Sequence, residues 1–334
     1  MASFLDRFRR GAAESGDAAP QLKTDLSQAQ FFTTPADPRD SKVSERYRDF
    51  FWQARKQKLA EIEQIVPYYE MPLGMPVATR AALERDDAAS AGALLKDFPP
   101  KVWGYYQQLS KDWGTLGRTD KLGPPMQLSR QRSEYRLNFI MNGLELAMGA
   151  GLDGLSVVDI ACNWGGFAVE ARLRGASEVV GFDIREENTA KAARLAQHFG
   201  LDDIGFHTAD LFAYDPGRTF DVVLNLGLMY HISQPFEMMK KTFELSNRAA
   251  VIDTVVHREA VSGFILGTGE MATDHAATAI GVELHPTYRA LIDLAYMVGF
   301  RQVIEIHGLP DPSWEKFANE PYGNKTRRCI VALK

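Results

Sequence analysis

Cysteine is scarce in this sequence, since only Cys162 and Cys329 occur among 334 residues. Two cysteines without a metal-site spacing exclude a disulfide framework and a cysteine-based metal centre, and they fit a reducing compartment. The sequence also lacks a run of about eighteen apolar residues, the length that a membrane-spanning helix needs. The first sixteen residues, MASFLDRFRRGAAESG, have mixed charge and no long apolar stretch. We therefore predict a cytoplasmic protein that does not bind membranes.

Excess charge of either sign is small as well. The formal net charge is -5, with 45% hydrophobic and 24% charged residues. This composition is typical of a globular chain with enough apolar material for one large or two modest domains. It gives no global reason to bind a polyanion, although a local basic patch on an acidic protein can still do so. We expect a small-molecule substrate, do not favour nucleic acid, and leave a homo-oligomer open.

Composition and periodicity divide the chain into three parts. Residues 1–45 are predicted to be a flexible leader, because the segment is rich in Ala, Ser, Asp and Pro and has little periodicity. In residues 46–150 apolar side chains recur at helical spacing between prolines, which predicts a mainly helical region serving as a lid or dimer surface. Residues 151–334 are predicted to form a ligand-binding domain.

The third part alternates between strand-like and helix-like segments. The apolar runs LSVVDIA, SEVVGFDI, FDVVLNLGL and AAVIDTVV are separated by helical patterns such as REENTAKAARLAQHFG and PFEMMKKTFELS. Such alternation predicts parallel strands joined by right-handed crossovers, an α/β doubly wound, Rossmann-like sheet. The segments RQVIEIHG and RRCIVALK follow one another without a helix. We therefore expect one late strand to be antiparallel.

Two carboxylates end neighbouring predicted strands. Asp159 precedes the turn ACNWGG, and Asp183 ends the next strand. Doubly wound sheets bind ligands beyond these strand ends, where an acid such as Asp183 can accept two hydrogen bonds from a ribose diol. A dinucleotide requires the cradle G-x-G-x-x-G, and an acid at 159 would repel its diphosphate. The acid suits a cationic nucleoside, S-adenosylmethionine, although both acids could alternatively cap the helices that follow them.

Four segments in order, VVDIACNWGGFA, VVGFDI, HTADLF and FDVVLNLGLMYHISQP, resemble the successive motifs of class I S-adenosylmethionine-dependent methyltransferases. The resemblance spans roughly residues 120–334. Its first motif departs from D-x-G-x-G-x-G, because Ala161 and Asn163 stand at the first two glycine positions and Gly165 at the third.

This resemblance implies S-adenosylmethionine as the cofactor and assigns residues to its parts. Asp159 and the 161–165 turn would lie beside the methionine portion, and Asp183 would hold the ribose. The other implied contacts, two flanking the adenine and two under the cofactor beyond the fourth strand, are Asp210, Leu211, Asn225 and Gly227.

Three further segments, LGLMYHISQP, KLGPP and RRCIVALK, resemble the bacterial tRNA wobble-uridine carboxymethyltransferase family, whose cofactor is carboxy-S-adenosylmethionine. By this resemblance Lys121, Tyr230 and Arg328 would hold the extra carboxylate of that cofactor. Two cations and a phenol make a chemically sensible carboxylate receptor. The alternative is that Lys121 and Arg328 are solvated surface charges.

Methyl transfer from a sulfonium is an in-line displacement that chiefly requires alignment, and a hydroxyl or amine acceptor also needs a base. Histidine, with an ordinary pKa of about 6.5, suits that task. Tyr230 and His231 follow a strand end, and His257 and His275 lie in the segment 253–289, which we expect to build the acceptor pocket. Near them stand further potential metal ligands, whose spacing matches no recognised metal motif: Glu259, Glu270, Asp274, Glu283 and His285.

Three functions remain open at this point. The first is methyl transfer to a small polar metabolite. The second is carboxymethyl transfer to a tRNA base, and the third is non-catalytic binding of an adenosyl ligand, suggested by the altered first motif. A second late loop could close over the same site, with Trp314 and Tyr322 as its walls.

Overall fold

The computed structural model describes residues 66, 68–71, 75–96, 98, 106–268, 282–308, 322 and 325–334. The predicted leader 1–45, the candidate base His275 and the proposed wall residue Trp314 lie outside the described residues.

An eight-stranded sheet forms the centre of the fold, with the strand order β1-β12-β13-β9-β8-β5-β6-β7. Strands β5 to β9 are mutually parallel, as the alternating sequence pattern predicts. The late strand β13 runs antiparallel to both β9 and β12, which confirms the expected antiparallel strand. The strands are β1 (Tyr68–Met71), β5 (Ser156–Ile160), β6 (Glu178–Asp183), β7 (Gly205–Thr208), β8 (Phe220–Leu226), β9 (Ser246–Val255), β12 (Gln302–Gly308) and β13 (Arg327–Leu333).

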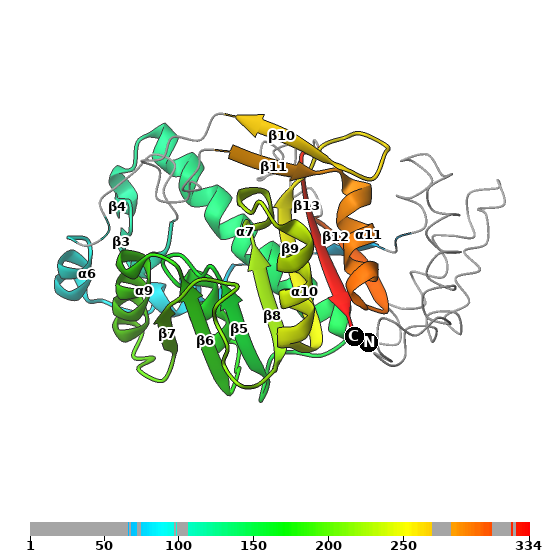
Figure 1. Ribbon diagram of the computed structural model, residues 1–334. Helices are drawn as coiled ribbons and strands as arrows, with labels where there is room; N and C mark the ends of the chain where they lie inside the picture. Colours follow the sequence, from blue (N-terminus) through cyan, green and yellow to red (C-terminus); the bar gives the residue numbers. More distant parts are fainter. Residues whose placement is uncertain are drawn as a thin grey trace, which may run out of the picture.

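Helices cover both faces of this sheet (Figure 1). One face packs against α7 (Pro124–Met148), α8 (Gly166–Leu173) and α9 (Glu186–His198), and the other against α10 (Pro235–Leu245) and α11 (Tyr288–Val298). Because side chains alternate along a strand, Leu224 of β8 joins the first core and its neighbour Val223 joins the second. Burying such a side chain contributes about 1.5–3 kcal/mol, so the continuous apolar runs stabilise both layers. None of the described helices is long and apolar enough to cross a membrane.

The region before the sheet is less helical than its periodicity predicts. The helices α5 (Val77–Leu83) and α6 (Ala88–Leu94) are present, but the next segment forms a small sheet of β2 (Gln108–Ser110), β3 (Trp113–Gly114) and β4 (Gly117–Arg118). These short strands depart from the helical spacing of the apolar residues in that segment. Apolar side chains satisfied the helical period, while the turn between β2 and β3 places Gln108 opposite Gly114.

Helix α7 begins at Pro124, which occupies its first turn, where the missing N–H of proline does no harm. It ends at Gly149, whose φ of 67° is the left-handed conformation that glycine adopts readily at helix ends. The 3-10 turn η2 (Thr119–Lys121) precedes it.

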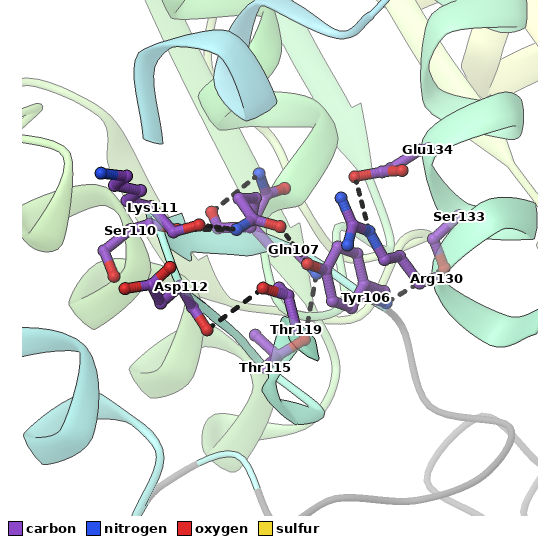
Figure 2. Close-up of polar contacts among 11 residues, drawn as sticks. Tyr106, Gln107, Ser110, Lys111, Asp112, Thr115, Thr119, Arg130, Ser133 and Glu134 are labelled. Atoms are coloured by element: carbon purple, nitrogen blue, oxygen red, sulfur yellow. Dashed lines mark hydrogen bonds and ion pairs between the residues drawn. The ribbon is translucent and has the colours of Figure 1, made fainter. Parts of the chain in front are cut away.

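Polar contacts fasten the small sheet to α7 (Figure 2). The backbone N–H of Tyr106 donates to Ser133 Oγ at 3.0 Å, and the guanidinium of Arg130 lies 5.5 Å from the centre of the Tyr106 ring. Arg130 also pairs with Glu134 one turn along the helix. These contacts fix the position of α7, the helix that carries Arg136 to the end of the sheet described next.

Candidate functional site

The strand order reverses between β5 and β8, since β6 and β7 continue on one side of β5 and β9 follows on the other side of β8. Ligands of doubly wound sheets bind beyond the carboxyl ends of the strands at such a switch point. The 3-10 turn η3 (Met229–His231) follows β8 directly. The antiparallel hairpin of β10 (Phe264–Thr268) and β11 (Val282–Pro286) lies beyond the same end of the sheet (Figure 1).

The turn after β5 has the backbone of a glycine-rich motif. Ala161, Asn163 and Gly165 have φ angles of 54°, 49° and 76°, all in the left-handed region. The three positions that the resemblance assigns to glycine therefore adopt the conformation that glycine favours. A Cβ at Gly165 would lie 2.7 Å from the Cβ of Ala192, so this position also requires glycine for space. Non-glycine residues held in such a conformation carry strain, which clusters at functional sites.

Relief of this strain is testable with Ala161→Gly. We expect the free energy of unfolding to rise by about 0.5–1 kcal/mol, because the left-handed penalty of about 1–2 kcal/mol is removed and part of it is offset by the more flexible unfolded chain. Thermal denaturation measures the change. The matched control is Ala190→Gly at an exposed position of α9, which should instead destabilise by about 0.5–1 kcal/mol. Equal losses in both variants would contradict a strained turn.

Asp159, the last but one residue of β5, has one carboxylate oxygen without a partner. Its side chain is 2% exposed, and its Oδ2 has no hydrogen-bond partner among the described residues. Burial, and secondly the neighbouring charge of Asp183, raise the pKa of Asp159 to about 8. A hydrogen bond from the backbone of Ala168, in the first turn of α8, opposes this shift, so the capping alternative is also present. The unpaired oxygen leaves room for a cationic partner.

Asp183 accepts hydrogen bonds that hold the turn after β5 in place. Its Oδ2 accepts a hydrogen bond from the backbone N–H of Asn163 at 3.0 Å, and its Oδ1 accepts from Arg185 N at 3.0 Å and Asn188 Nδ2 at 3.1 Å. The N-cap residue of α9 is Arg185 and no side chain caps that helix, so Asp183 holds the turn before α9 and does not cap it. A carboxylate accepts about four hydrogen bonds, so the ribose contact remains compatible and stays a prediction.

Asp210 and Leu211 follow β7. Asp210 Oδ1 accepts hydrogen bonds from the backbone N–H groups of Phe212 at 2.8 Å and Ala213 at 3.2 Å, and this shapes the turn. Leu211 is buried in the core on the α10 side of the sheet. Their expected position beside an adenine stays a prediction.

Asn225 lies near the end of β8. It is fully buried, and its Nδ2 donates to Thr242 Oγ1 of α10 at 2.9 Å. Because side chains alternate along β8, Asn225 shares the α10 face with Val223, and its expected position under the cofactor stays a prediction. Gly227 does lie at the strand end with a φ of 85°, where a Cβ would lie 3.0 Å from Arg327 Nη2 and 3.8 Å from Tyr230 Oη.

The receptor predicted from Lys121, Tyr230 and Arg328 requires a correction. Arg328 is buried, forms an ion pair with Glu305, and stacks over Tyr288 at 4.3 Å. Lys121 is exposed on η2. Alternation along β13 turns Arg328 toward α11, whereas Arg327 points to the opposite face and lies 5.7 Å from the Tyr230 ring. The structure therefore places Arg327, and not Arg328, beside Tyr230.

A buried cluster of charges surrounds Asp253, which lies two residues before the end of β9. Arg136 Nε donates to Asp253 Oδ2 at 3.0 Å, Arg327 Nε donates to the same oxygen at 2.9 Å, and Tyr322 Oη donates to Oδ1 at 2.8 Å. Burial alone would raise the pKa of Asp253, but the two guanidinium groups outweigh it and hold the pKa at about 2. Tyr322, predicted as a pocket wall, thus joins this cluster.

Aromatic and imidazole groups meet beside the cluster. The Tyr230 ring lies 4.0 Å from the His231 ring and 5.9 Å from the ring of His285 on β11. His285 Nε2 is 2.5 Å from Glu283 Oε2. His257 follows β9, and its backbone N–H donates to Pro286 O at 2.8 Å. The described residues contain no group of three or more His, Cys, Asp and Glu side chains that could hold a metal ion, so His285 and Glu283 form a pair here.

Residues 157–247 match a family model described as a methyltransferase domain. Over this segment the chain is similar to methyltransferase domains. It is 36% identical over 149 residues to the ubiquinone biosynthesis O-methyltransferase of Ruegeria pomeroyi, which covers 44% of this chain and 58% of that relative. It is 32% identical over 145 residues to the mitochondrial enzyme of the same name from Arabidopsis thaliana, covering 39% of this chain and 44% of the relative. The chain thus spans less than two thirds of these relatives.

The crystal structure of the N-terminal domain of EvdMO1 with SAH bound superposes with a TM-score of 0.52 at 15% identity, covering 75% of this chain and 96% of that one. This similarity supports the Rossmann-like architecture of the methyltransferase domain.

The segment matched by the family model contains only part of the candidate site. Asp159, Asp183 and Tyr230 lie inside residues 157–247 of the methyltransferase domain. The arginines at 136 and 327 and the His285–Glu283 pair lie outside it. The sequence offered no signal for the arginine cluster, because Arg136 and Asp253 are 117 residues apart and meet only in the folded chain.

Proposed function

We propose that this protein transfers the methyl group of S-adenosylmethionine to a hydroxyl group of a small polar metabolite. The observation that carries the proposal is the buried, unpaired Oδ2 of Asp159 in a left-handed turn at the switch point of the sheet. An acid in that position favours a cationic nucleoside over a phosphorylated one.

The residues of the turn fit this cofactor. Asp159 supplies an anion for the ammonium end, Gly165 permits close approach of the backbone, and Asp183 retains acceptor capacity for ribose hydroxyls. When bound, the cofactor supplies a methyl group on a positively charged sulfur. The protein then has to orient the acceptor in line with that methyl group and exclude water.

Proton removal falls to His285. Its Nε2 contacts the carboxylate of Glu283, which orients the imidazole ring. The other ring nitrogen, Nδ1, is then the one that takes the proton of the acceptor. The carboxylate stabilises the imidazolium that forms. Tyr230, edge-on to His285 at 5.9 Å, holds the imidazole near the end of β8. The neighbouring His231 and the more distant His257 are the other candidates for the base.

An oxygen acceptor is supported by the relatives, which are named ubiquinone biosynthesis O-methyltransferases. A hydroxyl must lose its proton as the methyl group arrives, whereas a thioether has none to lose. The His285–Glu283 pair is suited to the first case.

The second candidate is carboxymethyl transfer from carboxy-S-adenosylmethionine to a tRNA base. It is favoured by Arg327, which faces Tyr230 where the resemblance expected Arg328. The formal net charge of -5 gives this second candidate less support, because a tRNA-binding protein has to attract a polyanion. Mass spectrometry of cofactor copurified with the protein separates the two candidates by one carboxyl group.

Isothermal titration tests the proposed cofactor. We expect S-adenosylmethionine and S-adenosylhomocysteine to bind, and NAD, which carries a diphosphate, not to bind. Incubation of the wild-type protein with S-adenosylmethionine and a small-molecule cell extract should then yield S-adenosylhomocysteine faster than incubation of the Asp159→Ala variant. The extract also supplies the acceptor, which can be identified from it. Binding of NAD without S-adenosylmethionine would remove the proposal, and binding without turnover would leave an adenosyl-binding protein.

A further inference from the structure

The hairpin that carries His285 is separate from the main sheet. Strands β10 and β11 form a sheet of their own, in which His285 lies opposite Ile265. A two-stranded hairpin is only marginally stable by itself in water. A general base, by contrast, has to be held within about 0.5 Å of its productive position. The contacts at the open end of the hairpin, where β11 leads into α11, therefore decide where His285 lies.

The hydroxyl of Thr287 is the centre of these contacts. Thr287 directly follows β11 and is fully buried. Its Oγ1 donates a hydrogen bond to Val261 O at 2.6 Å and accepts hydrogen bonds from Gly263 N at 3.3 Å and Ala290 N at 3.1 Å. A hydroxyl has one donor and two acceptor sites, so all three are used. One oxygen atom thus joins the loop after β9, the end of β11 and the first turn of α11.

Backbone hydrogen bonds hold the same segment from both sides. The N–H of Thr287 donates to Gly263 O at 2.9 Å. On the other side, His257 N donates to Pro286 O at 2.8 Å, and Tyr288 N donates to His257 O at 3.3 Å. The residues that follow β11 are therefore fixed between the end of β9 and the loop that leads into β10.

The position of Thr287 is passed on to His285. The two residues are separated by one residue of extended chain, a distance of about 7 Å. On its other side Thr287 begins α11, which Leu291 and Ala295 anchor in the core between the helix and the sheet. Strand β11 also lies against η3, which carries Tyr230. Thr287 thus connects His285 to a rigidly packed helix, and sites held by helices are more precise than sites on loops.

We infer that Thr287 is a positioning residue for the general base. Its hydroxyl fixes the open end of the hairpin so that Nδ1 of His285 meets the hydroxyl of the acceptor. Because Thr287 is fully buried, it acts through His285 and not on a reactant. A displacement of about 1 Å at a reacting group can lower the rate about 10²-fold. The inference rests on the proposed function, because it concerns the alignment of His285 for methyl transfer.

Two variants of Thr287 test the role of the hydroxyl. Thr287→Val removes it at nearly constant size, and Thr287→Ser retains it. Full-length protein is incubated with saturating S-adenosylmethionine and the small-molecule cell extract, and formation of S-adenosylhomocysteine is measured. We expect Thr287→Val to lower the rate by about 10–100-fold and Thr287→Ser to stay within about threefold of wild type. The dissociation constant of S-adenosylmethionine, measured by calorimetry, should change less than about twofold in both variants.

Combination with His285→Gln separates positioning from a general loss of structure. If Thr287 acts through His285, Thr287→Val should lower the rate by less than about twofold once His285 has been replaced, because coupled residues are not additive. A loss of structure would multiply the two effects. The full effect of Thr287→Val in the His285→Gln background would overturn the inference.

Thr287 is also the N-cap of α11, so a further variant separates the cap from the hairpin contact. Thr287→Asp keeps an acceptor for Ala290 N, and Asp is a favoured N-cap residue, but its carboxylate has no proton to donate to Val261 O. It should lose activity as Thr287→Val does, and it replaces that variant if Thr287→Val does not fold. A wild-type rate in Thr287→Asp would overturn the inference.

The matched control removes a cap from another helix. Asp87 caps α6, where its Oδ1 accepts from Ser90 N at 2.9 Å, and α6 packs against α9 and the small sheet. Asp87→Ala should therefore retain the wild-type rate, and a loss equal to that of Thr287→Val would overturn the inference. A wild-type protein that binds S-adenosylmethionine but forms no S-adenosylhomocysteine would remove the proposed function and this role with it. An active wild type with an unchanged rate in Thr287→Val would overturn the positioning role alone.

Discussion

His285→Gln is expected to lower kcat for methyl transfer by about 10²–10⁴-fold, the usual contribution of a general base. The dissociation constant of S-adenosylmethionine should change less than about twofold, because His285 lies on the β11 hairpin outside the cofactor-binding turn. Glutamine retains the size and polarity of the side chain but cannot accept and release a proton near neutral pH. The acceptor identified from the extract and quantification of S-adenosylhomocysteine supply the assay.

Variants of the neighbouring groups give an independent measure. Glu283→Gln removes the charge that orients the ring and should reduce kcat less than the loss of the base. His231→Gln and His257→Gln should each retain more activity than His285→Gln. A larger loss in His231→Gln than in His285→Gln would place the base on η3.

Asp159→Asn is expected to weaken S-adenosylmethionine binding by about 10–100-fold, because it removes one charge-assisted interaction of about 1.5–3 kcal/mol. The ligand-free protein should nevertheless denature at the same temperature or higher, since the variant replaces a buried carboxyl whose Oδ2 has no partner. Calorimetric titration and differential scanning fluorimetry measure the two effects. Asp183→Asn is the contrast, because Asp183 accepts three hydrogen bonds and its replacement should lower the denaturation temperature.

The same residue predicts a pH dependence of stability. The pKa of Asp159 is about 8 in the folded protein against 3.8 as its ordinary value, so the folded state retains a proton that the unfolded state has lost. The contribution of Asp159 to stability therefore falls as pH rises from about 4 to about 8. The decline should be smaller in Asp159→Asn and smaller with S-adenosylmethionine bound. An identical decline in wild type and variant would show that Asp159 is already ionised in the ligand-free protein.

The strands of the sheet and the polar residues at their ends can be predicted from short stretches of sequence. The apolar runs of β5, β6, β8 and β9 need neither long-range contacts nor special turns to be recognised, and each ends in or beside a polar residue. The altered motif was readable too, because Ala161 and Asn163 occupy glycine positions and the structure gives them glycine-like φ angles. The β2–β4 sheet could not be read in this way, since two- and three-residue strands leave no periodic pattern.

The sequence alone did not predict on which face of the sheet a given side chain lies. Arg327 and Arg328 are adjacent in sequence and chemically identical. Only the register of β13 against β9, and the placement of α7 and α11 on opposite faces, decides which arginine meets Tyr230. A one-residue step along a strand exchanges its two faces, so a motif alignment that is correct to one residue can still select the wrong side chain.

The sequence by itself determined the doubly wound sheet, the acid-ended strands and the left-handed turn after β5, because strand periodicity and turn conformation depend on neighbouring residues. Tertiary structure alone decided the other half of the site. Arg136, Asp253, His285 and Arg327 come from a helix, two strands of the main sheet and a hairpin. Their charges interact through space, and chain folding sets the distances between them.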